Sequence, residues 1–415
     1  MKFYNQKIFL KKLIEKYNKK KFAGQSYPLL ENAFTTEDIL TGIEVILSKK
    51  ITMSEITREF EYEFSRYIGS KYALMVNSGS SANLLAAFAL TNPKKKNHLK
   101  RGDKFLIPAI CWSTSLWPFI QAGLRPLFLD VNANNFCLDE QKINNNILQK
   151  IRLIVTIHVL GNSSNIDLIS KLSRKHNIFL VEDTCESLGS RYNQKYLGTF
   201  GDFGTYSFYY SHQITSGEGG MIVCNDKNDY ELLHTLRAHG WDRGLKNKLN
   251  NTFNFINSGF NLRPLDITAA IGLSQFKRLK KMMLLRKNNR DIIINEITNH
   301  KKFKTQFEFF EPTKNLEPSW FGLPLLINKN YKSKKKYFLQ YLDSKKIENR
   351  PIISGNFLNQ PAIKLFDLHK KNIKNLFPVA QDIDERGFFI GLPTQKIAIN
   401  QLNYLINTLL NFDGF

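Results

Sequence analysis

The stretch YSFYYSHQITSGEGG (206–220) contains a group that can move a proton near neutral pH. An aromatic run leads into a polar turn with Ser211 and His212, and glycines around Glu218 follow. This layout is typical of a strand that delivers a side chain to a pocket. An imidazole accepts and returns protons near neutrality but makes no stable imine. For an isolated histidine the alternative is a hydrogen-bonded turn residue, so the other motifs must decide the role of His212.

A second motif, NSGSSAN (77–83), lies between a short apolar run and a run of small residues. Backbone amides, hydroxyls and a helix N-terminus together make a site for an anion such as phosphate. Gly79 and Ser80 lie at the centre of the motif. The same Ser-Gly turn can also serve only to cap a helix, so the motif alone leaves both interpretations open.

Two further apolar runs end in residues that suit a flat aromatic ligand. VEDTCES places Asp183 at the C-terminal end of a predicted strand, where open α/β sheets bind ligands. A carboxylate there can pair with the ring nitrogen of pyridoxal phosphate (PLP), or it can cap a helix. Trp112, in PAICWSTS, can stack on such a ring or fill the core. With Ser207, whose hydroxyl can reach a phosphate, these residues outline a PLP pocket.

Apolar segments that alternate with helical patterns must position these residues. Beyond the short run before NSGSSAN, strands are predicted at 104–113, 125–131, 151–161, 177–185 and 204–210. Amphipathic helices are predicted at 36–48 and 54–67. Apolar strands interleaved with helices predict a sheet that is covered on both faces. A long helix around 264–295 is expected to connect this sheet to a smaller α+β domain.

The length of 415 residues favours two or three structural units. We expect a basic N-terminal segment (1–27), a large domain (28–285) and a small C-terminal domain (286–415). No stretch approaches the roughly 20 apolar residues of a membrane helix, and the N-terminus lacks a signal-type apolar core, so we expect a cytoplasmic protein that does not engage a membrane.

The net charge of +23 comes from lysines spread along the whole chain rather than from one patch. We therefore expect no nucleic-acid partner, although a basic surface also attracts a nucleotide-linked substrate. The cysteines at 111, 137, 185 and 224 lie far apart and form no C-x-x-C pair. Neither a zinc ribbon nor an iron–sulfur loop can be assigned to them, and no metal site is expected.

Six motifs together resemble the signature of the DegT/DnrJ/EryC1/StrS family of nucleotide-sugar aminotransferases. They follow the family order: NSGSSAN, PAICWSTS, VEDTCES, GTFGDFGTYSF, GEGGMI and SGFNLRPLDITAAIG. The resemblance implies a PLP-dependent transferase of fold type I, with a mixed seven-stranded sheet in the large α/β domain and a small α+β domain. It also implies a homodimer with shared active sites. In this family a lysine that forms a Schiff base with PLP stands where His212 stands here.

The histidine resembles a branch of the family, the lysine-less sugar 3-dehydratases. YSHQITSGEGG, RAHGWDR, SWFG and NRPIISGNF look most like the branch that acts on GDP-4-keto-6-deoxy-D-mannose. This resemblance implies PLP or pyridoxamine phosphate (PMP) held without a covalent bond, removal of the sugar 3-hydroxyl, and glutamate as the donor that regenerates PMP. The CDP-sugar branch carries an iron–sulfur cluster on cysteines after the histidine, whereas Cys224 alone follows His212, so no cluster is expected.

The resemblance also assigns roles to individual residues. His212 would be the catalytic acid and base, Asp183 would bind the ring nitrogen, and Glu186 would approach the ring hydroxyl. Gly79, Ser80 and Ser207 would hold the phosphate together with Asn261, which would come from the partner subunit. Trp112 would stack on the ring. His239, Arg243 and Arg350 would contact the substrate, because guanidinium groups suit phosphates. Surface charge or pairing between domains is the alternative for these three residues.

Two other functions remain open from the sequence. The protein can be a nucleotide-sugar aminotransferase that has recruited another lysine, although Lys195 belongs to a hydrophilic turn outside the motif position. It can also be a catalytically inactive family member. The combination of Asp183, Glu186 and an acid/base group at position 212 argues against an inactive protein.

Overall fold

The computed structural model describes residues 2–21, 27–30, 34–245, 253–369 and 371–415. A mixed seven-stranded sheet with the order β1-β9-β8-β5-β4-β2-β3 forms its centre. Its strands are β1 (Tyr72–Val76), β2 (Lys104–Pro108), β3 (Arg125–Leu129), β4 (Leu153–Ile157), β5 (Phe179–Asp183), β8 (Phe203–Ser207) and β9 (Gly220–Cys224). The strands predicted from the sequence are confirmed, whereas β9, which runs antiparallel to both neighbours, is not among them.

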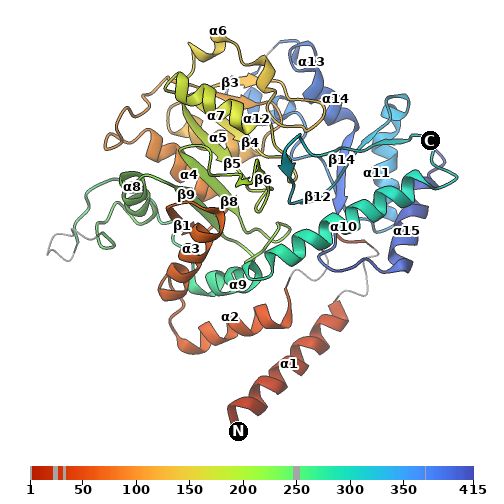
Figure 1. Ribbon diagram of the computed structural model, residues 1–415, viewed down its shortest axis with the longest axis horizontal. Helices are drawn as coiled ribbons and strands as arrows, with labels where there is room; N and C mark the ends of the chain where they lie inside the picture. The colour runs from red at the N-terminus through yellow and green to blue at the C-terminus, as the bar shows by residue number, and fades with distance from the viewer. Residues whose placement is uncertain (1, 22–26, 31–33, 246–252, 370) are drawn as a thin grey trace.

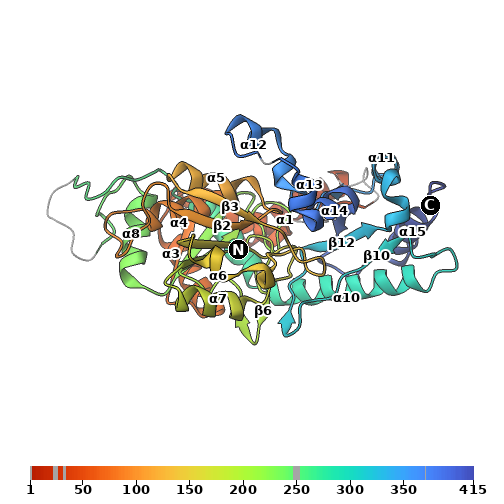
Figure 2. The ribbon, with the colours of Figure 1, turned by 90° about the horizontal axis from the view of Figure 1, so that it is seen from above.

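Helices cover both faces of this sheet (Figures 1 and 2). The helices before the connector are α1 (Lys2–Lys21), α2 (Thr36–Ser48), α3 (Glu55–Ile68), α4 (Gly79–Leu90), α5 (Ser113–Gln121), α6 (Asn145–Leu148), α7 (Ile166–Lys175), α8 (Lys227–Arg237) and the 3-10 turn η1 (Glu140–Lys142). Successive side chains of a strand point to opposite faces of the sheet. Leu74 packs with α4, α5 and α8, whereas Met75 packs with α3 and with α9 (Asp266–Phe276). Every residue of β4, β8 and β9 is buried, which is why these strands do not alternate between apolar and polar residues.

The connector is two helices, so the prediction of one long helix is wrong. The chain forms α9 (Asp266–Phe276) and α10 (Leu279–Thr298). The short break between them includes Arg278, whose Nη2 lies 2.6 Å from an Asp38 oxygen of α2. This contact holds the break against α2, while α10 runs on to the C-terminal part of the molecule (Figure 1). The predicted boundary between residues 285 and 286 falls inside α10 and stays a prediction.

The C-terminal part has the predicted α+β character. Its sheet is antiparallel, with the order β10-β12-β14-β13. The strands are β10 (Phe307–Glu308), β12 (Gly322–Ile327), β13 (Asn349–Arg350) and β14 (Gly387–Gly391). The helices are η2 (Lys329–Lys334), α11 (Lys335–Ser344), η3 (Phe357–Asn359), α12 (Pro361–Leu365), α13 (Ile373–Leu376), α14 (Pro378–Arg386) and α15 (Ile399–Leu410). Tyr27, fully buried, ties the N-terminal segment to this sheet through a hydrogen bond from its hydroxyl to the Gly391 carbonyl, at 3.0 Å.

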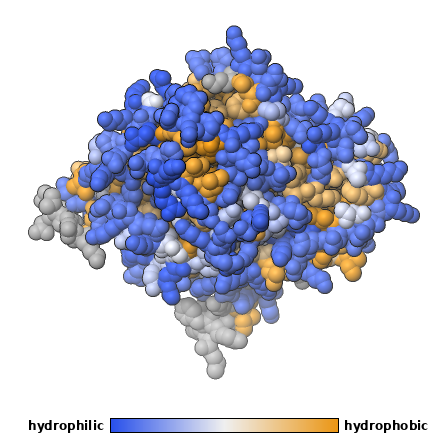
Figure 3. All heavy atoms as spheres, turned by 45° about the horizontal axis from the view of Figure 1, so that its top comes forward, coloured by the Kyte–Doolittle hydropathy of each residue, from blue (hydrophilic) through white to orange (hydrophobic). Residues whose placement is uncertain are grey.

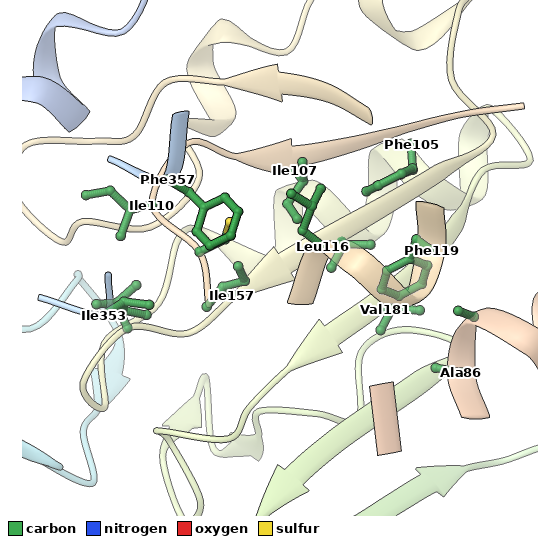
Figure 4. Close-up of a cluster of buried hydrophobic side chains, with 14 of the residues drawn as sticks. Ala86, Phe105, Ile107, Ile110, Leu116, Phe119, Ile157, Val181, Ile353 and Phe357 are labelled. Atoms are coloured by element: carbon green, nitrogen blue, oxygen red, sulfur yellow. The ribbon is translucent and has the colours of Figure 1, made fainter. Parts of the chain in front are cut away.

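Two features join the C-terminal part to the large sheet. A three-stranded sheet combines β6 (Arg191–Tyr192) and β7 (Lys195–Tyr196) with β11 (Leu316–Glu317). The main hydrophobic core also crosses between the two parts. Figure 4 shows Ile353 and Phe357 beside Ile110 and Ile157. The carboxyl edge of the large sheet is therefore closed by the C-terminal part.

The face shown in Figure 3 is mostly hydrophilic, and its hydrophobic atoms gather in separate patches. No helix within the described ranges is long and apolar enough to cross a membrane.

Candidate active site

The carboxyl edge of the seven-stranded sheet carries the candidate site. Strands β1, β8, β5, β4 and β2 run in one direction, so the segments after them converge at this edge. A cavity of roughly 670 Å³ lies there. Its lining includes these predicted site residues: Gly79, Ser80, Trp112, Asp183, Glu186, Ser207, His212 and Arg350.

The turn between β1 and α4 forms one wall of the cavity. Ser78 caps α4, because its Oγ accepts the Ser81 N–H at 3.1 Å. A Cβ added at Gly79 would lie 2.6 Å from the Cβ of Ser207, so only glycine lets this turn pack against the end of β8. The free amides of a helix N-terminus and the hydroxyls of Ser80 and Ser207 therefore border one pocket, an arrangement that suits a phosphate.

Asp183 ends β5 and is held rigidly. Its Oδ2 accepts hydrogen bonds from Asn83 Nδ2 at 2.8 Å and from Ser115 Oγ at 2.7 Å. Its Oδ1 accepts the Cys185 N–H at 3.2 Å. These donors fix the carboxylate, which is only 4% exposed, at the floor of the cavity. A fixed anion at this place suits a cationic ring nitrogen.

Trp112 and Glu186 border the same cavity as Asp183. Trp112 precedes α5 and is 55% exposed, so its indole ring is available to a flat ligand. Glu186 Oε2 accepts the Leu160 N–H at 3.0 Å. Burial raises the pKa of Glu186 to about 7, the hydrogen bond from Leu160 partly opposes this rise, and the charge of Asp183 adds to it. Glu186 therefore changes its charge near neutral pH.

His212 lies in the turn that follows β8, where its ring borders the cavity. The ring packs edge-on against Tyr209 and Phe321, with centroid distances of 6.0 and 5.1 Å. Its Nδ1 is buried and has no hydrogen-bond partner among the described residues. Burial and then the charge of Arg286 lower the pKa of His212 to about 3. The imidazole is therefore neutral at physiological pH, which is the form that accepts a proton.

No lysine lines this cavity in the part of the chain that the structure describes. Lys195, weighed above as a substitute nucleophile, belongs to β7 and places its Nζ 4.4 Å from the centre of the Phe200 ring. The site therefore has a proton acceptor at position 212, but among the described residues no lysine amine that could form a Schiff base lines it.

The opposite wall comes from the C-terminal part and from the N-terminal segment. Arg350 pairs with Glu348, whose Oε1 lies 2.6 Å from the arginine Nη2. Glu348 Oε2 also accepts the Leu29 N–H at 3.0 Å, which draws the N-terminal segment over the cavity. Leu29, Phe321 and Ile353 give this wall an apolar surface. Arg350 thus lies in the site, where it pairs with a carboxylate of its own segment rather than with one of another domain.

Three predicted site residues lie outside this chain's own cavity. Asn261 is exposed, and its Oδ1 accepts a hydrogen bond from Arg263 Nε at 3.0 Å. His239 and Arg243 are also exposed, and Arg243 lies over the Trp241 ring at 5.1 Å. Isolated β-bridges join Ala238 to Asn261 and Trp241 to Phe255, so these residues belong to one exposed arm. Their roles stay predictions.

Several residues of the site escape sequence reasoning. Asn83 stands in NSGSSAN one helical turn after Gly79. This spacing places both residues on the same face of the helix, so the sequence could have indicated that Asn83 faces the site. Ser115 is the last residue of PAICWSTS, three positions after Trp112, whereas Glu348 and Leu29 carry no comparable signal, because they reach the site only through the tertiary fold. His158 also lines the cavity, and its Nε2 lies 3.1 Å from the buried carboxylate of Glu182, behind Asp183.

The residues present fit PLP or PMP. The close approach at Gly79 leaves a cradle bordered by amides and hydroxyls, Asp183 offers a fixed anion, and Trp112 offers an exposed ring. For a metal ion the described residues provide no group of three or more histidine, cysteine or acidic side chains.

Comparison with known proteins agrees with this geometry. The DegT/DnrJ/EryC1/StrS aminotransferase family model matches residues 33–409. GDP-4-keto-6-deoxy-D-mannose 3-dehydratase of Escherichia coli O55:H7 is 38% identical over 92% of this chain and 99% of that protein. A solved histidine-to-asparagine variant of GDP-4-keto-6-deoxymannose-3-dehydratase with bound GDP-perosamine is 36% identical, with a TM-score of 0.84, covering 92% of this chain and 100% of that one. Another structure of GDP-4-keto-6-deoxymannose-3-dehydratase, with a trapped PLP-glutamate geminal diamine, is 35% identical, with a TM-score of 0.82 and the same coverage. The chain belongs to the DegT/DnrJ/EryC1/StrS aminotransferase family.

Proposed function

We propose that the protein is a PLP/PMP-dependent lyase that removes the 3-hydroxyl group of a nucleotide-linked 4-keto-6-deoxy sugar, GDP-4-keto-6-deoxy-D-mannose. Glutamate is the amino donor that regenerates PMP. The observation that carries the proposal is His212 in a cavity without a described lysine. A histidine suits an elimination, because it transfers protons without holding the cofactor covalently. The similarity to GDP-sugar 3-dehydratases supports the choice of nucleotide and sugar.

Each residue at the sheet edge contributes one function. The turn at Gly79 and Ser80, with Ser207, would hold the phosphate, and Trp112 would offer its ring to the flat cofactor. Asp183 keeps a positive charge on the ring nitrogen. When bound, the cofactor supplies an electron sink next to the sugar, which allows the 3-hydroxyl to leave.

His212 supplies the proton transfers. Its neutral ring accepts a proton on a nitrogen and later returns it, so one group can serve both the dehydration and the reaction with glutamate. The apolar wall at Leu29 and Phe321 limits the access of water. Arg350 can exchange Glu348 for an anionic group of the substrate or donor, since a guanidinium fork binds phosphate and carboxylate alike.

The active form in this proposal is a homodimer with shared sites. The exposed residues His239, Arg243 and Asn261 do not line this chain's own cavity, which supports a role in the cavity of a second copy. Asn261 of the partner subunit then contacts the phosphate. The 3-deoxy-4-keto product would feed a dideoxysugar of a surface polysaccharide, as the family resemblance implies.

The test is to incubate the protein with PMP, glutamate and a panel of nucleotide 4-keto-6-deoxysugars and to follow product masses. The proposal expects a GDP-sugar product that is lighter by one oxygen atom, together with ammonia and 2-oxoglutarate. A 4-amino sugar, with a covalent adduct after borohydride reduction of the PLP-loaded protein, would identify an aminotransferase. Weak PLP binding without a glutamate-dependent spectral change would identify an inactive protein.

A further inference from the structure

The turn that carries His212 is held by groups from several other elements. Arg286 of α10 donates from Nη2 to the His212 carbonyl at 3.2 Å. The next side chain, Gln213, donates to the carbonyls of Glu186 and Ser319. The position of the imidazole is thus fixed through its own main chain and through that of its neighbour.

Arg286 is unusual because it is a buried cation without an anionic partner. It is 2% exposed, and no carboxylate of the described residues lies within ion-pair distance. Its Nε has no hydrogen-bond partner among those residues. Burial lowers its pKa to about 10, which still leaves it charged at neutral pH. Burying an unpaired charge is costly, so a structural role alone would be served better by an apolar side chain.

We propose that Arg286 is a positioning residue for His212, which it holds through the hydrogen bond from its guanidinium group to the His212 carbonyl. This inference rests on the proposed function for the role of His212 as the base. The buried charge has a second effect, because a cation beside an imidazole disfavours the imidazolium form. Arg286 therefore holds the main chain of His212 in place and adds to burial, the larger of the two causes that lower the pKa of the imidazole.

The other charged groups around the cavity do not replace Arg286. The titratable residues that line the cavity, besides His212, are Asp183, Cys185, Glu186, His158, Tyr209, Tyr210, Glu218, Glu348 and Arg350. Burial and Arg286 are nevertheless the two causes that lower the pKa of His212, and no carboxylate offsets them. Without Arg286, the pKa of His212 should rise, while burial, the larger of the two causes, still keeps it below that of an ordinary histidine.

The position of Arg286 on α10 links the base to the C-terminal part. Figures 1 and 2 both show α10 running from the large sheet to that part. One turn further along the same helix, Arg290 lies over the Trp320 ring at 4.5 Å and donates to the Phe310 carbonyl, without an interaction with His212. Arg290 is 5% exposed and so provides a matched control, a second buried arginine on the same helix.

The experiment compares Arg286→Met, Arg286→Lys and Arg290→Met with the wild-type full chain. The first readout is the titration of His212 in the cofactor-free protein, followed by NMR of carbon-13-labelled histidine and assigned with His212→Asn. Arg286→Met should raise the pKa of His212, because it removes the charge while burial, the larger cause of the low value, remains. Arg286→Lys should keep the low value because it keeps the charge, and Arg290→Met should leave the titration unchanged.

The second readout is steady-state kinetics of the PMP-loaded enzyme. Arg286→Met should lower kcat by about 10-fold or more with little change in KM for the nucleotide sugar, because the base is misplaced rather than the substrate site. Arg286→Lys should recover part of kcat. Arg290→Met should not show a loss of kcat at an unchanged KM.

Three outcomes would overturn the proposal. One is an Arg286→Met protein in which His212 titrates as in the wild type. Another is an equal loss of melting temperature in Arg286→Met and Arg290→Met with kcat of the folded protein unchanged. If Arg286→Met does not fold, an Arg286→Lys protein in which the pKa of His212 rises to that of an ordinary histidine overturns the proposal, because the lysine still supplies the buried charge. Failure of the proposed function is recognised separately, because His212→Asn would then remain active while the titration still reports the influence of Arg286.

Discussion

The imidazole of His212 meets the ring of Phe321 edge-on, with centroids 5.1 Å apart and ring planes at 88°. Phe321 directly precedes β12, and its N–H donates to the Leu160 carbonyl at 3.2 Å, across to the large sheet. The C-terminal part therefore touches the proposed base directly, and the two parts of the chain build the site together.

Phe321→Ala should lower kcat by about 10-fold while changing KM little, because the imidazole loses the ring that fixes its orientation. Steady-state kinetics at saturating PMP would measure this split. Phe389→Ala is the matched control, since Phe389 lines the same cavity and packs against Phe321 at 5.7 Å without an aromatic contact to His212. Equal losses of kcat in both variants would show that the contact with His212 has no special role.

Asp183→Asn should reduce turnover by a factor on the order of 10² or more, because a neutral amide cannot stabilise a protonated ring nitrogen. The fold should persist, as judged by circular dichroism and gel filtration. Ser115→Ala removes one donor to the same carboxylate without changing its charge, so it should cost far less activity. Wild-type turnover in Asp183→Asn would show that Asp183 does not stabilise the ring nitrogen.

Asn261→Ala should weaken cofactor retention if the residue completes the partner's phosphate site. Mixing this variant with His212→Asn gives a sharper test, because only a mixed dimer contains one site with both native side chains. After subunit exchange, about a quarter of wild-type sites should be restored, since half of the dimers are mixed and each has one intact site. No recovery in a mixture shown to exchange subunits, or full activity of a purified monomer, would contradict the shared site.

The parts of the site that the sequence predicts are those that follow predicted strands. Gly79, Asp183 and Ser207 stand at strand ends, and the carboxyl ends of parallel strands meet at one edge. The sequence did not predict strand β9, because it follows a run of glycines that gives no local sign of a strand. It did not predict the break between α9 and α10 either, because the helical pattern continues through it.

Contacts between distant segments could not be predicted from the sequence. Glu348 binds the main chain of Leu29 across 319 positions, and Arg286 reaches His212 across 74. No periodicity or motif relates such pairs, because their proximity depends on how α10 and the C-terminal sheet pack against the large sheet. The proposed role of Asn261 in the site of a second copy was suggested by the sequence only through the family resemblance.

Glu186 should make the cofactor-free protein less stable as pH rises. Its pKa of about 7 exceeds the usual 4.5, so the folded protein holds an extra proton between these values. The unfolded chain holds fewer protons there, and the free energy of unfolding falls as pH rises through this window. Glu186→Gln does not ionise and should escape this loss. Urea titrations at about pH 5 and about pH 8 should show a larger advantage of the variant at the higher pH; an equal difference at both would contradict the raised pKa.

His212→Lys tests whether a histidine is required for dehydration. A lysine should capture PLP as a Schiff base, seen as a shifted absorption band and a borohydride-stable adduct, because the new amine stands where other family members have theirs. It should slow the loss of the 3-hydroxyl, since the captured cofactor is no longer free to react with the sugar. His212→Asn is the control: it should still bind PLP or PMP through the phosphate and ring contacts but lose dehydration by a factor on the order of 10² or more. Dehydration at the wild-type rate in either variant would show that His212 is not the base.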